Sequence, residues 1–281
     1  MRINCVGCGL DITAKNDNVK VTLNRRGGRS AYMCAECARR MSGYTFENDI
    51  RVGVEKVNKF TYAFELETSY TNEKARAELY ADKFVPTSDC TVNVEYKTPI
   101  YRGLNAPSKQ AVTIESLINN GDMRIGDECG THIHVGEENY INPETMNYLK
   151  RFYNTLFTPL SNAMCENHAD VKKVFGRDFE HWAQPVNMNS YADTHENFIN
   201  MQHAYTVEYR ICMFKNAKQF QNTLKLCKEF TAILINNFIM HFNDETYDTS
   251  RYSSIREYRL HKAQVTANKL VKAYRKAVTN A

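Results

Sequence analysis

Charged or imidazole side chains occupy alternate positions in four short segments of this chain. The segments are Phe64-Glu65-Leu66-Glu67, Asn93-Val94-Glu95, His132-Ile133-His134 and Val207-Glu208-Tyr209-Arg210. Alternate residues of a β-strand point to the same side, so each segment would have one apolar face and one face of metal- or phosphate-binding groups. If these strands are neighbours in one sheet, their polar faces form a single site.

The composition is that of an ordinary globular protein. The chain has 281 residues, 43% hydrophobic and 24% charged, which is enough for one sizeable core and a small additional module. No apolar run approaches the ~20 residues that span a bilayer, and the segment that begins at Met1 lacks the apolar stretch of a secretion signal. We therefore expect a cytoplasmic protein with no membrane partner. The net charge of +4 is spread along the chain and does not by itself predict nucleic-acid binding.

Four of the nine cysteines form two C-x-x-C pairs, Cys5 with Cys8 and Cys34 with Cys37. An odd number of cysteines without an export signal does not fit a disulfide framework, whereas four thiolates suit tetrahedral Zn²⁺. Between the pairs, segments 19–23 and 30–33 flank a turn-rich stretch and predict a hairpin, and the second pair opens a short helix. Residues 1–45 are therefore expected to form a four-cysteine zinc finger of the treble-clef or zinc-ribbon type, with structural zinc.

The partner of this finger is left open by its residues. Arg25, Arg26 and Arg29 cluster at the predicted hairpin tip. Exposed turns are often charged, however, so nucleic-acid binding is not the favoured interpretation. Recruitment of a protein by the finger is an equal alternative.

Residues 50–281 show the pattern of an α+β domain. Alternation and β-branched or aromatic content predict strands over 51–57, 62–67, 91–97, 131–135 and 206–214. Helices are predicted over 72–82, 108–119, 143–167, 217–242 and 254–278, with Asn142 capping the third and Pro159 kinking or dividing it. The strands are not evenly interleaved with helices, so we expect an antiparallel sheet with helices on one face.

Glu65 and Glu67 would place two carboxylates ~7 Å apart on one strand face. Neighbouring carboxylates repel unless solvent or a cation compensates them, and Mg²⁺ takes one or two carboxylates together with waters and substrate phosphates. An isolated pair of this kind is more often part of a solvated surface. The chemical interpretation therefore depends on the other segments.

The segment that contains His132 and His134 places both imidazoles on one strand face. Gly130 and Gly136 bracket it, and glycine lets other backbone or a ligand approach closely. A lone histidine is usually structural or on the surface. For a pair flanked by glycines, a role in metal or phosphate binding fits as well as a structural one. Both interpretations stay open for this segment on its own.

Glu208 and Arg210 share one face of the last segment, and Val207, Tyr209 and Ile211 form its apolar face. A carboxylate beside a guanidinium is often only a local ion pair. Beside bound phosphates, however, the arginine would neutralise charge that develops in a transition state while the glutamate holds a metal ion.

In their order along the chain, these motifs resemble the amidoligase family of carboxylate–amine ligases, which are related to glutamine synthetase and glutamate–cysteine ligase. The matching motifs are Phe-Glu-Leu-Glu-Thr at 64–68, Asp89 followed by Glu95-Tyr96-Lys97-Thr98-Pro99-Ile100, Cys-Gly-Thr-His-Ile-His-Val at 129–135 and Thr-Val-Glu-Tyr-Arg at 206–210. They cover about residues 50–245 and exclude the finger. The resemblance implies a glutamine synthetase-like catalytic domain whose antiparallel sheet binds ATP and divalent cations on its polar face. The chain has no P-loop pattern, which is consistent with a nucleotide held through metal ions.

The resemblance also implies roles for single residues. The magnesium-binding positions that it gives are Glu65, Glu67, Glu95, His134 and Glu208. Arg210 matches the phosphate-contacting arginine and would be catalytic together with Glu95 and His132, although either imidazole of the pair can be the metal ligand. No role is implied for Asn200 or His203, which are expected to be structural or on the surface.

The expected reaction joins a carboxylate to an amine at the expense of ATP. Transfer of the γ-phosphoryl group would give an acyl phosphate, and attack by the amine would release phosphate and leave an amide or peptide bond. The substrates would be small-molecule or peptide carboxylates and amines. Two other classes stay open: a metal-dependent phosphoesterase, and a non-enzymatic module that binds nucleic acid or protein through the finger and the basic last helix.

Overall fold

The structure is a computed structural model that describes residues 18–23, 29–34, 60–87, 94–179, 183–192, 196–241 and 247–281. The chain divides into two compact units, Met1–Lys59 and Phe60–Ala281. In the first unit, strands β1 (Asn18–Leu23) and β2 (Arg29–Cys34) pair antiparallel. Both strands of the predicted hairpin are therefore present.

Several predictions fall outside the described residues. Cys5, Cys8 and Cys37 lie there, and Cys34 ends β2 with a side chain that is also outside the description. The zinc finger, its Zn²⁺ and its partner therefore stay predictions. The same holds for the strand over 51–57 and for Asp89.

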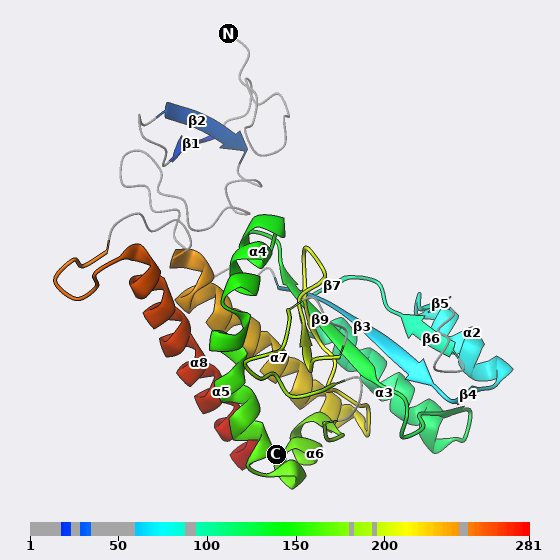
Figure 1. Ribbon diagram of the computed structural model, residues 1–281. Helices are drawn as coiled ribbons and strands as arrows, with labels where there is room; N and C mark the ends of the chain where they lie inside the picture. Colours follow the sequence, from blue (N-terminus) through cyan, green and yellow to red (C-terminus); the bar gives the residue numbers. More distant parts are fainter. Residues whose placement is uncertain are drawn as a thin grey trace. The chain divides into compact units, whose positions relative to one another are not determined.

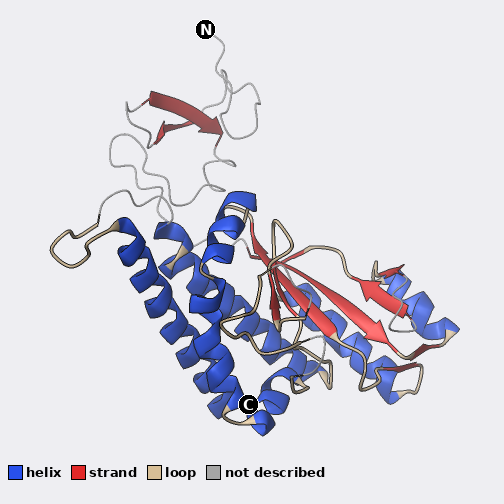
Figure 2. Ribbon diagram, in the orientation of Figure 1, coloured by secondary structure: helices blue, strands red, loops and turns tan. Residues whose placement is uncertain are grey.

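The described part of the second unit contains a seven-stranded sheet, shown in Figures 1 and 2. Its strands follow the order β10–β11–β9–β3–β6–β5, with β7 also pairing to β3, and all of these pairs are antiparallel. The bounds are β3 Phe60–Thr68, β5 Val85–Thr87, β6 Val94–Lys97, β7 Tyr101–Arg102, β9 Thr131–Glu137, β10 Ile199–Asn200 and β11 Val207–Tyr209. Two short strands, β4 (Tyr70–Thr71) and β8 (Met123–Arg124), pair separately.

Helices complete this unit. The predicted combination of helices with an antiparallel sheet is therefore confirmed. Their bounds are α2 Glu73–Ala81, α3 Asn105–Asn119, α4 Pro143–Arg151, α5 Tyr153–Cys165, α6 His168–Phe175, α7 Ala217–Asn237 and α8 Ile255–Asn280, with a 3-10 turn at Ile239–His241. None of the helices in the described ranges is long and apolar enough to cross a membrane.

Helix α7 packs on the apolar face of the sheet. Phe64 of β3 is 1% exposed, and its ring meets those of Phe220 in α7 and Phe84 edge-on, with centroids 5.1 and 5.7 Å away. On β11, which is separated from β3 by β9, the hydroxyl of Tyr209 lies 2.8 Å from that of Thr231 in α7. Burial of these alternate residues leaves the intervening residues on the opposite face of the sheet.

Two predicted elements have different bounds in the structure. The helix over 143–167 is two helices divided at Phe152, whose ring packs on Tyr148 and Phe238, while Pro159 lies inside α5. The strand over 206–214 pairs only over Val207–Tyr209. Beyond it, the N–H of Met213 donates to the carbonyl of Phe175 at 2.8 Å, so the backbone has left the sheet ladder.

Candidate active site

Polar residues of four neighbouring strands lie on one face of the sheet. The cross-strand partners are Glu208 with His134, His132 with Glu65, and Glu67 with Glu95. These pairs place β11, β9, β3 and β6 side by side and bring together residues that lie more than a hundred positions apart in the sequence. The predicted residues on these strands therefore form one row across the sheet, which we call the row: Glu208, His134, His132, Glu65, Glu67 and Glu95.

His132 lies at the centre of the first cluster. Its Nδ1 atom is 3.3 Å from Oε2 of Glu65 and 3.5 Å from Oε1 of Glu208. One ligand atom from each of these three residues lies within 4.8 Å of the other two, so the group can hold a metal ion. Two carboxylates and one imidazole form a donor set that suits a hard or borderline divalent cation.

A second cluster shares Glu208 and contains His203, which had been expected to be structural or on the surface. Nε2 of His203 lies 3.3 Å from Oε2 of Glu208, and its ring meets that of His134 edge-on with centroids 4.9 Å apart. These three residues also satisfy the distance criterion for a metal site. His203 reaches the row because the β10–β11 hairpin carries it there, with Asn200 opposite Glu208.

An unsatisfied buried atom supports the fit of a cation. Nε2 of His134 has no hydrogen-bond partner among the described residues, and it lies 3.6 Å from Oε1 of Glu65. Its other ring nitrogen lies 3.3 Å from the hydroxyl of Thr206. A buried imidazole nitrogen without a partner is costly. A cation bound by Glu65 and His134 would remove that cost.

Glu67 and Glu95 lie in the row but outside these two clusters. The N–H of Gly130 donates to Oε2 of Glu67, whose Oε1 lies 3.5 Å from Nε2 of His132. Glu95 accepts a hydrogen bond from the hydroxyl of Thr87 at 2.9 Å. Both carboxylates are buried, and they extend the row from β3 to β6.

Two cationic side chains, Lys97 and Arg210, contact the carboxylates of the row. Nζ of Lys97 lies 2.8 Å from Oε1 of Glu65 and 3.5 Å from Oε1 of Glu95. Nη1 of Arg210 donates to Oε1 of Glu208 at 2.9 Å. Lys97 belongs to the motif at 95–100 but had been given no role there. Its position between two carboxylates makes it a further member of the site.

The surroundings push the pKa values of the acids in opposite directions. Burial alone would raise the pKa of Glu208, but its contact with His203 and its electrostatic interactions with His132, His134 and Arg210 lower it to about 2. For Glu65, burial is likewise outweighed by neighbouring imidazoles and by Lys97, so its pKa is held well below its usual range. Burial and the nearby Glu65 raise the pKa of Glu95.

The lowered pKa of Glu208 predicts a dependence of stability on pH in the metal-free protein. Its folded-state pKa of about 2 lies below the ordinary value of 4.5, so the stability that the carboxylate contributes near neutral pH is lost as the pH falls through this interval. Between about pH 5 and about pH 3, wild type should lose about 2 kcal/mol more unfolding free energy than Glu208→Gln. Urea unfolding in EDTA measures the difference. Equal losses in the two proteins would contradict the assignment.

Two buried polar residues that sequence reasoning missed position this site. Nδ2 of Asn200 donates to Oε2 of Glu208 at 2.6 Å. The guanidinium of Arg177, which follows α6, donates to the carbonyls of Cys129 at 3.4 Å and Arg210 at 3.1 Å. Arg177 thereby ties the approach to β9 to the residue after β11. Neither residue belongs to an alternating segment, so the pattern had no signal for them.

An antiparallel sheet that gathers carboxylates, imidazoles and an arginine on one face defines the class: a domain with a candidate site for divalent cations. Residues 15–278 match the model of the family described as "Putative amidoligase enzyme", and the chain belongs to this family. Family membership indicates a ligase-type activity. The family resemblance seen in the sequence motifs is therefore confirmed, and the match extends beyond residues 50–245 into the segment that had been expected to form a separate finger.

Other comparisons add little to this assignment. A solved structure entitled "GmaS/ADP complex-Conformation 1" is similar to the chain with a TM-score of 0.39 and 10% sequence identity, over 93% of this chain and 90% of that one. No curated protein matches the chain significantly.

Proposed function

We propose that the protein is an ATP-dependent carboxylate–amine ligase that forms an amide or peptide bond through an acyl phosphate. The observation that carries the proposal is the pair of ligand clusters joined at Glu208, in a member of the amidoligase family. Arg210 supplies a phosphate-binding guanidinium beside them. These are the groups that phosphoryl transfer from a metal-bound nucleotide needs.

Glu65 and Glu208 are the cation-binding acids in this proposal. Glu65 and Glu208 stay anionic and, with His132, His134 and His203, would hold Mg²⁺ or a related divalent cation. Such cations neutralise phosphate charge and align the γ-phosphoryl group with the attacking carboxylate. Arg210, whose guanidinium already contacts Glu208, stabilises the charge on the transferring group.

Glu95 is the candidate base for the second step. When the amine nitrogen attacks the acyl carbon, the bond from that carbon to the phosphate oxygen breaks, phosphate leaves, and the nitrogen must lose a proton. Glu95 has a raised pKa beside Glu65, which makes it a better proton acceptor than the two carboxylates whose pKa values are lowered.

A cavity near the start of β3 offers room for a substrate. It has a volume of ≈ 610 Å³, within the range of small-molecule sites. Thr61, one of its lining residues, lies on the same face of β3 as Glu65 and pairs with Gly136, two positions beyond His134. The other lining residues are Ile100, Arg102, Glu137, Glu138, Ile141 and Tyr205. We assign this cavity to the carboxylate or the amine.

A screen for ADP release tests the proposed function. The purified full chain is incubated with ATP, Mg²⁺ and mixtures of amino acids, polyamines and peptides. We expect ADP only where a carboxylate and an amine are both present. Hydrolysis of phosphate esters without ATP and amine, with no ADP from any mixture, would replace the ligase by a phosphoesterase.

A further inference from the structure

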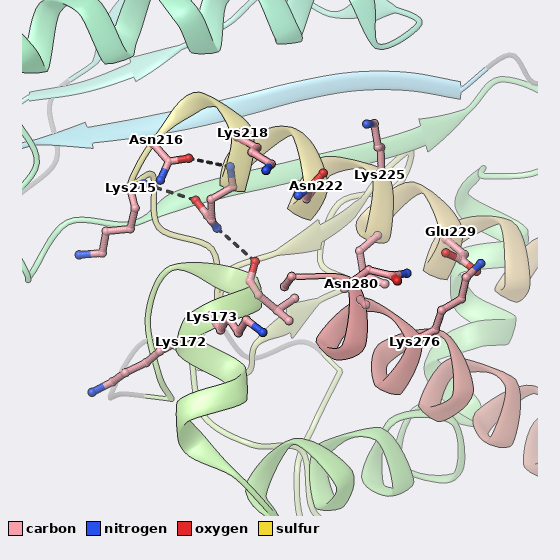
Figure 3. A pocket seen from close by; sticks show the side chains of 15 residues that line it. Lys172, Lys173, Lys215, Asn216, Lys218, Asn222, Lys225, Glu229, Lys276 and Asn280 are labelled. Atoms are coloured by element: carbon pink, nitrogen blue, oxygen red, sulfur yellow. Dashed lines mark hydrogen bonds between the residues drawn. The ribbon is translucent and has the colours of Figure 1, made fainter.

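A second charged concavity lies between α6, the start of α7 and the end of α8 (Figure 3). Its volume is ≈ 520 Å³. Six of its lining residues are lysines, which define what we call the lysine pocket: Lys172, Lys173, Lys215, Lys218, Lys225 and Lys276. The ring of Phe220 on α7 packs on Phe64 in the apolar face of the sheet, so α7 and the sheet separate this pocket from the candidate active site.

The helix dipole favours the position of two of these lysines and disfavours that of two others. Lys172 and Lys173 lie in the last turn of α6, where a positive charge is favoured by the helix dipole. Lys215 and Lys218 instead flank the start of α7, where the dipole is itself positive, and the first turn of α7 contains no acid. Helix stability therefore does not account for the positive charge at this end of the pocket.

Counter-charges inside the protein do not account for it either. In the described ranges, none of the six amines forms an ion pair with a carboxylate, in contrast to Lys74 with Asp122. Glu229 is the one acidic side chain among the described lining residues. It lies one turn of α7 from Lys225 but eleven positions, or ~16 Å, from Lys218, so it leaves the charge at the Lys215 end uncompensated. Surfaces normally intersperse both signs of charge, so an exposed concave cluster of one sign focuses a field that attracts anions.

The floor of the pocket is fixed by hydrogen bonds. Nε2 of Gln219 donates to the carbonyl of Val174 at 3.1 Å and to the hydroxyl of Thr223 at 2.9 Å, and that hydroxyl also donates to Val174 at 2.6 Å. The side chain of Asn216 caps α7 by accepting from the N–H of Gln219 (Figure 3). These bonds join α6 to α7 and hold the lysine-bearing backbone in place.

The lining residues select a chemical class of anion. All the cationic side chains are lysines, which act as point charges and lack the planar fork with which arginine reads a group bidentately. The described lining residues include no aromatic ring on which a nucleobase could stack. We propose that the lysine pocket binds a small, multiply phosphorylated anion through its phosphates alone.

Calorimetric titration of the full chain with tripolyphosphate tests the proposal. EDTA in the buffer removes divalent cations and with them the metal-dependent phosphate binding at the candidate active site. We expect Lys215→Gln/Lys218→Gln to weaken the Kd about tenfold, because two charge-assisted contacts are lost. Lys109→Gln/Lys272→Gln removes the same charge from exposed positions outside the pocket and should change the Kd less than about twofold.

Several results would overturn the proposal. No binding by wild type, or equal weakening in the two double variants, would refute a pocket-specific site. Tighter binding of a single-stranded oligonucleotide than of tripolyphosphate at equal phosphate concentration would refute the small-ligand class. Loss of binding in Arg210→Gln, which removes the cationic side chain beside Glu208, would place the anion in the active site instead. None of these outcomes bears on the ligase proposal, which has its own assay.

Discussion

Glu208→Gln is expected to lower amine-dependent ADP release by at least about 100-fold, since the change removes the ligand common to both clusters. Glu208 is 1% exposed. Its oxygens lie 3.5 Å from His132, 3.3 Å from His203 and 2.9 Å from Arg210. Glutamine keeps the shape of the side chain but not its charge, so the loss reports on electrostatics and ligation.

The measurement requires a substrate pair from the ADP screen and a matched control. Glu78→Gln makes the same chemical change at an exposed position of α2 and should leave turnover unaltered. Near-ultraviolet circular dichroism establishes that Glu208→Gln is folded. Wild-type turnover in a folded Glu208→Gln protein would refute the assigned site.

Phe64→Ala should lower the free energy of unfolding by about 3–5 kcal/mol, the usual cost of removing a buried phenylalanine. Phe64 is 1% exposed and touches the rings of Phe84 and Phe220, so its loss leaves a cavity between β3 and α7. The same side chain alternates with the acids of β3. Its loss should therefore also loosen the register on which the site depends.

Urea unfolding followed by circular dichroism measures this change. Tyr80→Ala removes an aromatic ring that is 76% exposed on α2 and should cost less than about 0.5 kcal/mol. If Phe64→Ala were no less stable than this control, α7 would not depend on the apolar face of β3 for its packing.

Sequence periodicity was enough to predict the principal elements of the second unit. Segments 62–67 and 131–135 fall within β3 and β9, and the helix predicted over 254–278 is α8 with slightly different ends. A kink or division of the helix over 143–167 was predicted at Pro159, but the helix divides at Phe152, whose ring packs on Tyr148 and on Phe238, a residue distant in sequence. Local propensity cannot register a contact of that kind.

The candidate site divides in the same way. Alternation alone placed Glu65 with Glu67, His132 with His134, and Glu208 with Arg210 on shared faces, because side-chain direction in an extended backbone repeats every two residues. Strand order and register then decide which acid meets which imidazole, and both depend on the packing of the apolar face against α7. His203 and Arg177 enter the site only through a hairpin and a loop whose positions no local pattern encodes.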